Sequence, residues 1–264
     1  MKNGSVLSLT RRSIGVLVSS PTQCVSTAIL AYAMAGVGKT LSARWNTAQA
    51  LLETWGRRAP SDLKVYAALA RSRSVFYTPT VGSTLRELRE DIPQLISRVD
   101  ICIEQHLRPK DAPIVHHRAN FVELLIIDEA DRLSTTGLEY LRDIFDRNGI
   151  ELILIGMPGI DKRLSRYPQL YSRVGFAHLY RPLQDDELTF VLTRRWRQLG
   201  VGLDDADFTD VQAVAAIVRI TRGNFRLLNR LFIQIKRILH INDLNVITDE
   251  VVETARSTLV IGDT

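Results

Sequence analysis

The sequence predicts an α/β fold, in which a doubly wound parallel sheet of five strands is followed by a small all-helical domain. Three observations predict it: apolar stretches alternate with helical patterns, a glycine-rich loop follows the first apolar stretch, and only helical patterns occupy the last third of the 264 residues. We expect an N-terminal extension over residues 1–25, an α/β domain over residues 26–181 and a helical domain over residues 182–264.

Five apolar stretches are the expected strands. They are short, rich in β-branched and aromatic residues, and bounded by turn-forming or charged residues. The third is almost continuously apolar, which is typical of a central parallel strand covered on both faces. In chain order, the strands are expected at residues 27–30, 74–77, 121–128, 151–155 and 177–180.

Apolar residues at helical spacing predict helices between these strands and after the last one. Asp185 and Thr248 are expected N-caps, because acidic residues follow each of them in the first turn. The helices are expected at residues 41–55, 83–107, 137–148, 185–199, 209–221, 224–240 and 248–257.

A phosphate-binding loop is predicted at Ala31–Thr40, AYAMAGVGKT, between the first strand and the first helix. Small residues allow successive backbone N–H groups to surround phosphate oxygens, Lys39 adds a positive charge, and the Thr40 hydroxyl can bind Mg²⁺. The helix behind the loop directs its positive N-terminus at the same phosphates. Ala33 departs from the usual pattern, which has glycine there. The expected contacts to the nucleotide are Ala35, Gly36, Val37, Gly38, Lys39, Thr40 and Leu41.

Asp128 and Glu129 end the third expected strand. In a doubly wound sheet the ligand lies at the C-terminal ends of the strands, so both acids are expected beside the phosphate loop. We assign Asp128 to Mg²⁺, together with Thr40, and Glu129 to the general base that polarises the attacking water.

Hydrolysis also requires positive charge at the developing transition state, and arginine suits this role because its planar fork stays protonated. Arg166 and Arg173 lie between the fourth and fifth expected strands. Arg173 immediately precedes the last strand, from which it could project into a neighbouring subunit. Arg226 opens a helix whose apolar residues occupy one face. With Lys39 and Glu129, Arg173 completes the expected catalytic set.

Four motifs over residues 26–240 resemble those of the AAA+ ATPases. AGVGKT resembles Walker A, LLIIDEAD resembles Walker B, Arg173 resembles the arginine finger, and GNFR at the start of a helix resembles sensor two. More narrowly, LLIIDEADRLSTTGLEYLRDIFDRNGIELILIGMPG resembles the transposition helpers TnsC, TniB and MuB.

This resemblance implies an ATPase that uses ATP and Mg²⁺ and forms a homo-oligomeric ring or filament on double-stranded DNA. It implies that the assembly marks target sites and recruits or stimulates a transposase, with a target-selector protein as a further partner. It also implies that Arg173 acts in trans and that Arg226 reads the γ-phosphate. Gly156-Met157-Pro158 stands where the family has a polar sensor-one residue, which predicts slow hydrolysis that DNA or a partner stimulates.

The loop after the second strand is the expected DNA contact. Hydroxyl side chains of Thr80 and Ser83 lie in it, with Arg86 and Arg89 on the helix behind, and the same region faces the duplex in the resembling proteins. Such contacts would be directed at phosphates and independent of base sequence. The net charge of +5 favours an anionic partner. Two other basic segments, residues 57–73 and 108–118, are the alternatives.

Two other functions remain open at this stage. One is a helicase loader or replication initiator of the same family, and the other is a signalling or secretion NTPase that switches between protein partners without DNA. The low cysteine count fits a reducing cytosol, and no apolar run approaches the roughly 20 residues of a membrane span. We therefore expect a cytoplasmic protein with no membrane partner.

Overall fold

The computed structural model describes residues 28–32, 34–56, 60, 62–108, 120–204 and 206–259. The expected N-terminal extension, Ala33 and most of the basic segment 108–118 lie outside the described residues. The described chain divides into two compact units. One unit contains the strands and the helices up to Tyr180. The other contains Arg181 onward together with the loop residues Ala35–Gly38.

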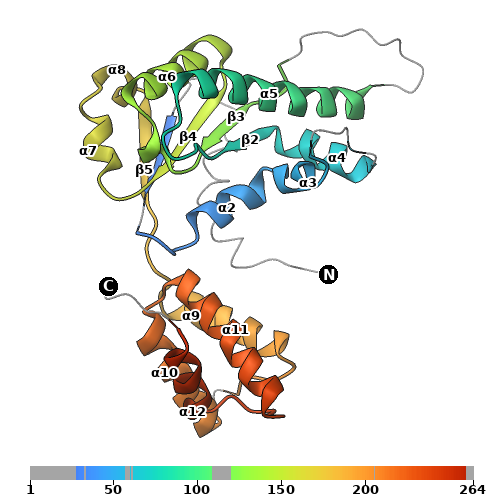
Figure 1. Ribbon diagram of the computed structural model, residues 1–264, viewed down its shortest axis with the longest axis vertical. Coiled ribbons are helices and arrows are strands. Elements are labelled where there is room, and N and C mark those ends of the chain that lie inside the picture. Colours follow the sequence, from blue (N-terminus) through green and yellow to red (C-terminus); the bar gives the residue numbers. More distant parts are fainter. Residues whose placement is uncertain are drawn as a thin grey trace. The chain divides into compact units, whose positions relative to one another are not determined.

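The first unit is built on a parallel sheet of five strands, as predicted. Their order across the sheet is β2-β3-β4-β1-β5, and all four neighbouring pairs are parallel. The strand that leads into the glycine-rich loop, β1, is therefore flanked on both sides (Figure 1). The strands are β1 Ala28–Tyr32, β2 Ser74–Tyr77, β3 Leu124–Ile127, β4 Glu151–Gly156 and β5 Val174–Leu179.

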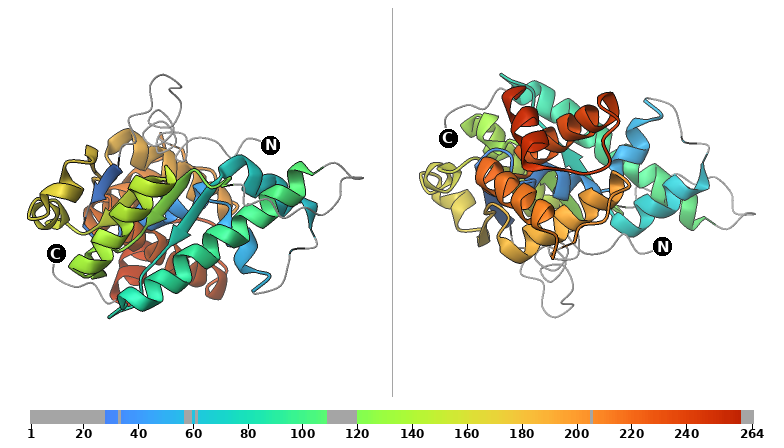
Figure 2. Two further views of the ribbon diagram at one scale, coloured as in Figure 1. Left: turned by 90° about the horizontal axis from the view of Figure 1, so that it is seen from above. Right: turned by 90° about the horizontal axis from the view of Figure 1, so that it is seen from below.

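Helices cover both faces of this sheet. Figures 1 and 2 show α2 on one face and α5 and α6 on the other. Right-handed crossovers explain the division, because the chain leaves β1 for the far edge strand β2 and then returns strand by strand in the opposite direction. The helical segments of this unit are α2 Lys39–Asn46, α3 Gln49–Glu53, α4 Leu63–Ser72, α5 Leu85–Leu107, the 3-10 helix η1 Ala130–Arg132, α6 Thr135–Asn148, α7 Ile160–Leu164 and α8 Pro168–Tyr171.

The single helix expected over residues 41–55 is two helices. Between α2 and α3, Ala48 adopts a left-handed conformation with φ of 52°. The neighbouring strand β2 lies at the edge of the sheet, so some of its N–H groups have no strand partner. The buried Gln49 side chain accepts a hydrogen bond from one of them, Phe76 N, at 2.7 Å. The break therefore supplies the acceptor that this edge strand requires.

Helix α4 lies in a segment for which we predicted no helix. Asp62 caps it by accepting a hydrogen bond from Lys64 N at 2.8 Å, and Val65 and Leu69 are buried one turn apart. The basic residues of this segment masked that short apolar pattern.

Another boundary differs because β5 begins at Val174 rather than at residue 177. As an exposed edge strand, β5 carries a weak apolar signal.

The second unit contains only helices, as predicted for the C-terminal part of the chain. Thr248 is confirmed as an N-cap, since its hydroxyl accepts a hydrogen bond from Val251 N at 3.3 Å. Asp185 is not an N-cap. The cap is Gln184, whose N–H donates to Glu187 at 3.1 Å, and Asp185 is the first helical residue. The helices are α9 Asp185–Gln198, α10 Phe208–Thr221, α11 Phe225–Ile241 and α12 Asp249–Ser257.

Trp196 is the largest fully buried side chain of the helical unit. Its indole Nε1 donates a hydrogen bond to Asp210 Oδ1 at 3.2 Å, and the other oxygen of the buried Asp210 accepts from Asp204 N at 2.9 Å. One carboxylate therefore satisfies two donors and ties α10 to α9 and to the loop between them.

We expect Asp210→Ala to lower the free energy of unfolding of the helical unit by about 1–3 kcal/mol, because two donors lose their acceptor. Urea denaturation followed by tryptophan fluorescence measures the change. Lys236→Ala, at an exposed position of α11, is the control and should change stability by less than about 0.5 kcal/mol. Equal stability of the two variants would contradict a structural role for Asp210.

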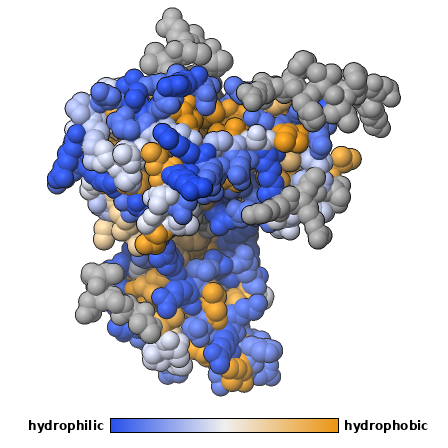
Figure 3. Space-filling view, turned by 45° about the horizontal axis from the view of Figure 1, so that its top comes forward, coloured by the Kyte–Doolittle hydropathy of each residue, from blue (hydrophilic) through white to orange (hydrophobic). Residues whose placement is uncertain are grey.

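Within the described ranges, no helix has both the length and the apolar composition needed to cross a lipid bilayer. On the face drawn in Figure 3, hydrophobic residues form small groups separated by hydrophilic ones. The buried apolar residues of the described chain form two cores, one around the sheet and one among the C-terminal helices.

Candidate nucleotide-binding site

The glycine-rich loop follows β1 in the chain. Gly36 and Gly38 have φ angles of +90° and +97°, which side-chain-bearing residues rarely adopt. A Cβ on Gly38 would meet no atom within 4 Å, so its requirement for glycine comes from the backbone conformation. Two positive φ angles separated by one residue turn the chain sharply between β1 and α2.

The two residues predicted to hold Mg²⁺ lie in direct contact. Thr40, in the first turn of α2, donates a hydrogen bond from Oγ1 to Asp128 Oδ2 at 2.6 Å. Asp128 follows β3 directly and is buried. Lys39 Nζ donates to the carbonyl oxygen of Gly156, at the end of β4, at 2.8 Å. The start of α2, after β1, thus supplies a hydroxyl and an ammonium group, the residue after β3 supplies a carboxylate, and the last residue of β4 supplies a carbonyl oxygen.

These groups fit a bound nucleotide with Mg²⁺. Mg²⁺ prefers oxygen ligands, retains several waters, and is usually held by one or two protein groups together with phosphate oxygens. Thr40 and Asp128 supply such groups. Within the described part of the chain, no cluster of three His, Cys, Asp or Glu residues could hold a metal by itself. A cation here would accordingly take its remaining ligands from phosphate and water.

Glu129, the predicted general base, lies beside Asp128 in a left-handed conformation with φ of 51°. Its carboxylate forms an ion pair with Arg132 one turn later in η1. Arg132 also donates from Nη1 to Pro79 O at 3.0 Å. Sequence reasoning missed Arg132, although the i, i+3 spacing from Glu129 is the signal for such a pair.

Gly156, at the end of β4, stands at the position expected for a polar sensor. A Cβ on Gly156 would lie 2.5 Å from Ile160 Cδ1 and 3.1 Å from Asp131 Oδ1. Asp131 is itself held in place, because its carboxylate accepts a hydrogen bond from Met157 N at 3.1 Å. A side chain at residue 156 would therefore require the Ile160 side chain to shift.

Arg173 lies at the opposite end of β1 from Lys39 and Thr40. Its carbonyl oxygen accepts a hydrogen bond from Ala28 N, at the start of β1, at 2.8 Å, whereas Lys39 and Thr40 follow the end of that strand. Five residues of strand separate the two edges by roughly 16 Å at about 3.3 Å per residue. The structure therefore does not bring Arg173 to the acids and the lysine of its own subunit.

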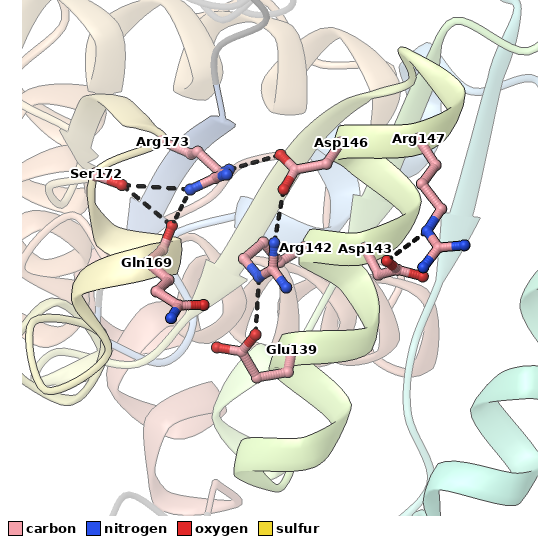
Figure 4. Close-up of polar contacts among 8 residues, drawn as sticks. All are labelled: Glu139, Arg142, Asp143, Asp146, Arg147, Gln169, Ser172 and Arg173. Atoms are coloured by element: carbon pink, nitrogen blue, oxygen red, sulfur yellow. Dashed lines mark hydrogen bonds and ion pairs between the residues drawn. The ribbon is translucent and has the colours of Figure 1, made fainter.

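The Arg173 side chain is held by α6 and α8 (Figure 4). Its Nε donates to Asp146 Oδ1 at 2.6 Å, and its Nη1 donates to Gln169 O at 2.5 Å. The hydrogen bond from Arg173 is the main reason why the pKa of the Asp146 carboxyl lies below its ordinary value. Arg166, the alternative candidate, is exposed between α7 and α8.

Arg226 lies in the first turn of α11, in the helical unit. Its backbone N–H donates to Gly36 O at 2.9 Å, and the neighbouring Asn224 side chain donates to Ala35 O at 3.2 Å. Both contacts lie within the second unit, to which Ala35–Gly38 belong. The Arg226 side chain is exposed. The start of α11 and the glycine-rich loop are thus joined by two hydrogen bonds.

The predicted DNA-contact residues differ in exposure. Thr80 is exposed, but Ser83 is buried, and its hydroxyl donates to Thr80 O at 3.0 Å. Arg86 is 88% exposed and forms an ion pair with Glu90 at 3.0 Å. Arg89 lies over the Tyr140 ring, 5.7 Å from its centroid. Both arginines are exposed.

Comparisons with known proteins identify the class. A family model described as AAA domain matches residues 26–164, which is more than half of the chain, and the chain belongs to that family. A Staphylococcus aureus protein described as a potential ATP-binding protein is 42% identical over 243 residues, covering 88% of each chain.

Solved structures of two proteins share the fold. Thermotoga maritima RuvB, described as a Holliday junction branch migration motor, aligns with a TM-score of 0.56 and 18% identity, over 97% of this chain and 68% of that one. Aeropyrum pernix ORC2 aligns with a TM-score of 0.55 and 15% identity, over 97% of this chain and 67% of that one. The architecture is therefore the AAA+ P-loop sheet with a helical C-terminal region.

Proposed function

We propose that this protein is an ATP-dependent, DNA-binding AAA+ regulator of DNA transposition. In this proposal it oligomerises on target DNA and recruits or activates a transposase. The contact between Thr40 and Asp128 at 2.6 Å carries the ATPase part, because it joins the two expected Mg²⁺ ligands at the end of the phosphate loop. Family membership and the ATP-binding description of the Staphylococcus aureus relative support the same assignment.

Each residue of the site has a chemical role in hydrolysis. Ala35, Gly36, Val37 and Gly38 would surround the phosphates with backbone N–H groups, Leu41 would continue this contact in α2, and Lys39 would neutralise phosphate charge. Thr40 and Asp128 would hold Mg²⁺, which neutralises charge that develops on the phosphate oxygens. Glu129 would accept a proton from the attacking water once its carboxylate leaves Arg132. Arg226 would contact the γ-phosphate from the helical unit.

The position of Arg173 supports the proposed homo-oligomer. Its distance from the acids and lysine of its own subunit leaves the positive charge of the arginine for a neighbouring subunit. Arginine fingers supplied in this way raise the rate of phosphoryl transfer by about a thousandfold or more. Assembly and hydrolysis would therefore be coupled.

The DNA part of the proposal rests on charge and on sequence resemblance. The net charge of +5 and the exposed Arg86 favour a phosphate backbone as partner. The resemblance of LLIIDEADRL to transposition helpers is the reason for proposing a transposase and a target-selector protein as partners. Residue 156 is glycine where the resembling family has a polar residue, which supports slow hydrolysis. Slow hydrolysis would make the ATP-bound assembly long-lived.

An electrophoretic mobility assay with a random duplex of about 60 base pairs tests the proposal, since phosphate-directed binding needs no particular sequence. We expect a shift with a non-hydrolysable ATP analogue and none with ADP or without nucleotide. Equal binding in all three states would contradict ATP-dependent assembly, and binding in none would favour a protein-partner switch. Stimulation of strand transfer by a transposase, sought among the products of the neighbouring genes, separates the proposal from a helicase loader or initiator.

Replacing Arg86 and Arg89, the two arginines predicted to contact DNA, should weaken DNA binding without affecting nucleotide binding. For Arg86→Ala with Arg89→Ala we expect about tenfold weaker binding at about 0.1 M salt and a salt slope smaller by roughly 1–2, because each lost phosphate contact releases one counterion fewer. Filter binding across a salt series measures both quantities, and a fluorescent ATP analogue checks the nucleotide site.

The control for this pair is Arg147→Ala with Arg219→Ala, which removes the same charge from two exposed ion pairs elsewhere. It should leave the salt slope almost unchanged. If both double variants weaken DNA binding equally, net charge rather than the β2–α5 loop determines affinity. In that case the segment over residues 57–73 becomes the next candidate.

A further inference from the structure

A line of alternating charges connects α6 to Arg173 (Figure 4). Arg142 bonds from Nε to Glu139 at 2.8 Å and from Nη1 to Asp146 Oδ2 at 2.7 Å. The other oxygen of Asp146 accepts from Arg173 Nε at 2.6 Å. Asp146 is thus shared between two guanidinium groups, one on its own helix and one immediately before β5.

The network fixes two of the three nitrogens of the Arg173 guanidinium. Nε is held by Asp146, and Nη1 is held by the Gln169 carbonyl and lies 3.4 Å from Ser172 Oγ. Within the described residues, the hydrogen bonds of this side chain come from these two atoms alone. The planar fork has five N–H donors, so the two donors of Nη2 are left without an acceptor among the described residues. A guanidinium held in this way is oriented before its acceptor arrives.

We propose that Asp146 is a positioning residue for Arg173. Its carboxylate holds the guanidinium at the edge of the subunit in the orientation in which Nη2 meets the nucleotide of a neighbouring subunit. This inference rests on the proposed trans role of Arg173. A pre-oriented group loses less rotational freedom when the transition state forms, and small displacements of such a group can cost about two orders of magnitude in rate. Arg142, itself held by Glu139, keeps the Asp146 side chain from rotating away.

The same helix provides a matched control. Asp143 forms an ion pair with Arg147 at 2.6 Å on α6, and Arg147 is 75% exposed. Figure 4 shows this pair beside the network but not joined to Arg173. Asp143→Ala therefore removes a carboxylate and an ion pair from α6 without removing a contact of Arg173.

The first experiment compares steady-state ATP hydrolysis of the full chain on duplex DNA. For Asp146→Ala we expect kcat to fall about tenfold with KM within about twofold of the unchanged protein, because ATP still binds to its own loop. Asp146→Asn should fall less, since its amide oxygen still accepts from Nε. In an Arg173→Ala background, Asp146→Ala should have no further effect. Asp143→Ala should behave as the unchanged protein.

Mixed assemblies separate a positioning role from a structural one. Asp146→Ala subunits retain Glu129, and Glu129→Gln subunits retain a correctly held Arg173. Mixing the two should restore hydrolysis at interfaces where the second subunit supplies the arginine. Mixing Asp146→Ala with Arg173→Ala should not restore it. A folding defect at residue 146 would give no recovery in either mixture.

The outcomes distinguish this inference from the proposed function. If Arg173→Ala hydrolyses ATP normally, the trans role of the arginine is wrong. If Arg173→Ala is impaired but Asp146→Ala and Asp146→Asn both match Asp143→Ala, the arginine acts and Asp146 does not position it. Additive losses in the double variant would likewise overturn the proposal. Should Asp146→Ala fail to fold, Asp146→Asn carries the same comparisons.

Discussion

Glu129→Gln is expected to lower kcat for ATP hydrolysis by a factor of about 10²–10⁴, the usual contribution of a general base. The amide is nearly isosteric with the carboxylate but accepts no proton from water at neutral pH. ATP binding should be retained, because the loop, Lys39, Thr40 and Asp128 are unchanged. Single-turnover hydrolysis and binding of a fluorescent ATP analogue measure the two properties separately.

The same substitution should lengthen the life of the ATP-bound assembly on DNA, since hydrolysis is the step that ends it in the proposed function. Dissociation of labelled duplex after dilution measures this lifetime. Glu250→Gln, an exposed acid at the start of α12, is the control and should leave both rates unchanged. Hydrolysis of Glu129→Gln at the rate of this control would assign the base to another residue.

Arg173→Ala is expected to lower kcat by about a thousandfold, at the lower end of the range for arginine fingers. Each site loses the positive charge that its neighbour supplies, while its own loop continues to bind ATP. Mixing Arg173→Ala with Glu129→Gln should recover part of the activity, because one kind of subunit retains the base and the other retains the arginine.

Arg147→Ala is the control for this substitution, because Arg147 is an exposed arginine of the same unit whose ion pair lies within α6. Its kcat should remain within about twofold of the unchanged protein, as expected of a surface position away from the site. Loss of activity in Arg173→Ala without any recovery in the mixture would place the arginine's role inside its own subunit. The roughly 16 Å between the two edges of the sheet opposes that outcome.

The sequence was sufficient to predict the parts of the sheet that depend on continuous apolar runs. The bounds of β2 agree with the predicted residues 74–77, and β3 and β4 lie within one or a few residues of their predictions. The start of β5 was predicted three residues too late, because an exposed edge strand is not required to be apolar on both faces. The helix break at Ala48 depends on Gln49 reaching Phe76 N, a contact between distant segments that no local pattern encodes.

The candidate site shows the same division. Thr40 and Asp128 could be paired from the sequence because strand ends converge at one edge of a parallel sheet. The side chains that contact Glu129 and Arg173 could not be predicted from the sequence. The ion pair between Glu129 and Arg132 and the one between Arg173 and Asp146 depend on side-chain rotamers and on the packing of neighbouring helices. The burial of Ser83 likewise follows from a turn that returns its hydroxyl to Thr80.

The place of β1 in the sheet has a consequence for folding. This strand pairs with β4, where Ile29 lies opposite Ile153, and with β5, where Leu30 lies opposite Ala177. Both partners are made long after β1 during synthesis, and contacts so distant in sequence form slowly. A nascent chain that ends before β5 has an unpaired edge on β1. The glycine-rich loop should therefore take its final form only after most of the sheet unit has left the ribosome.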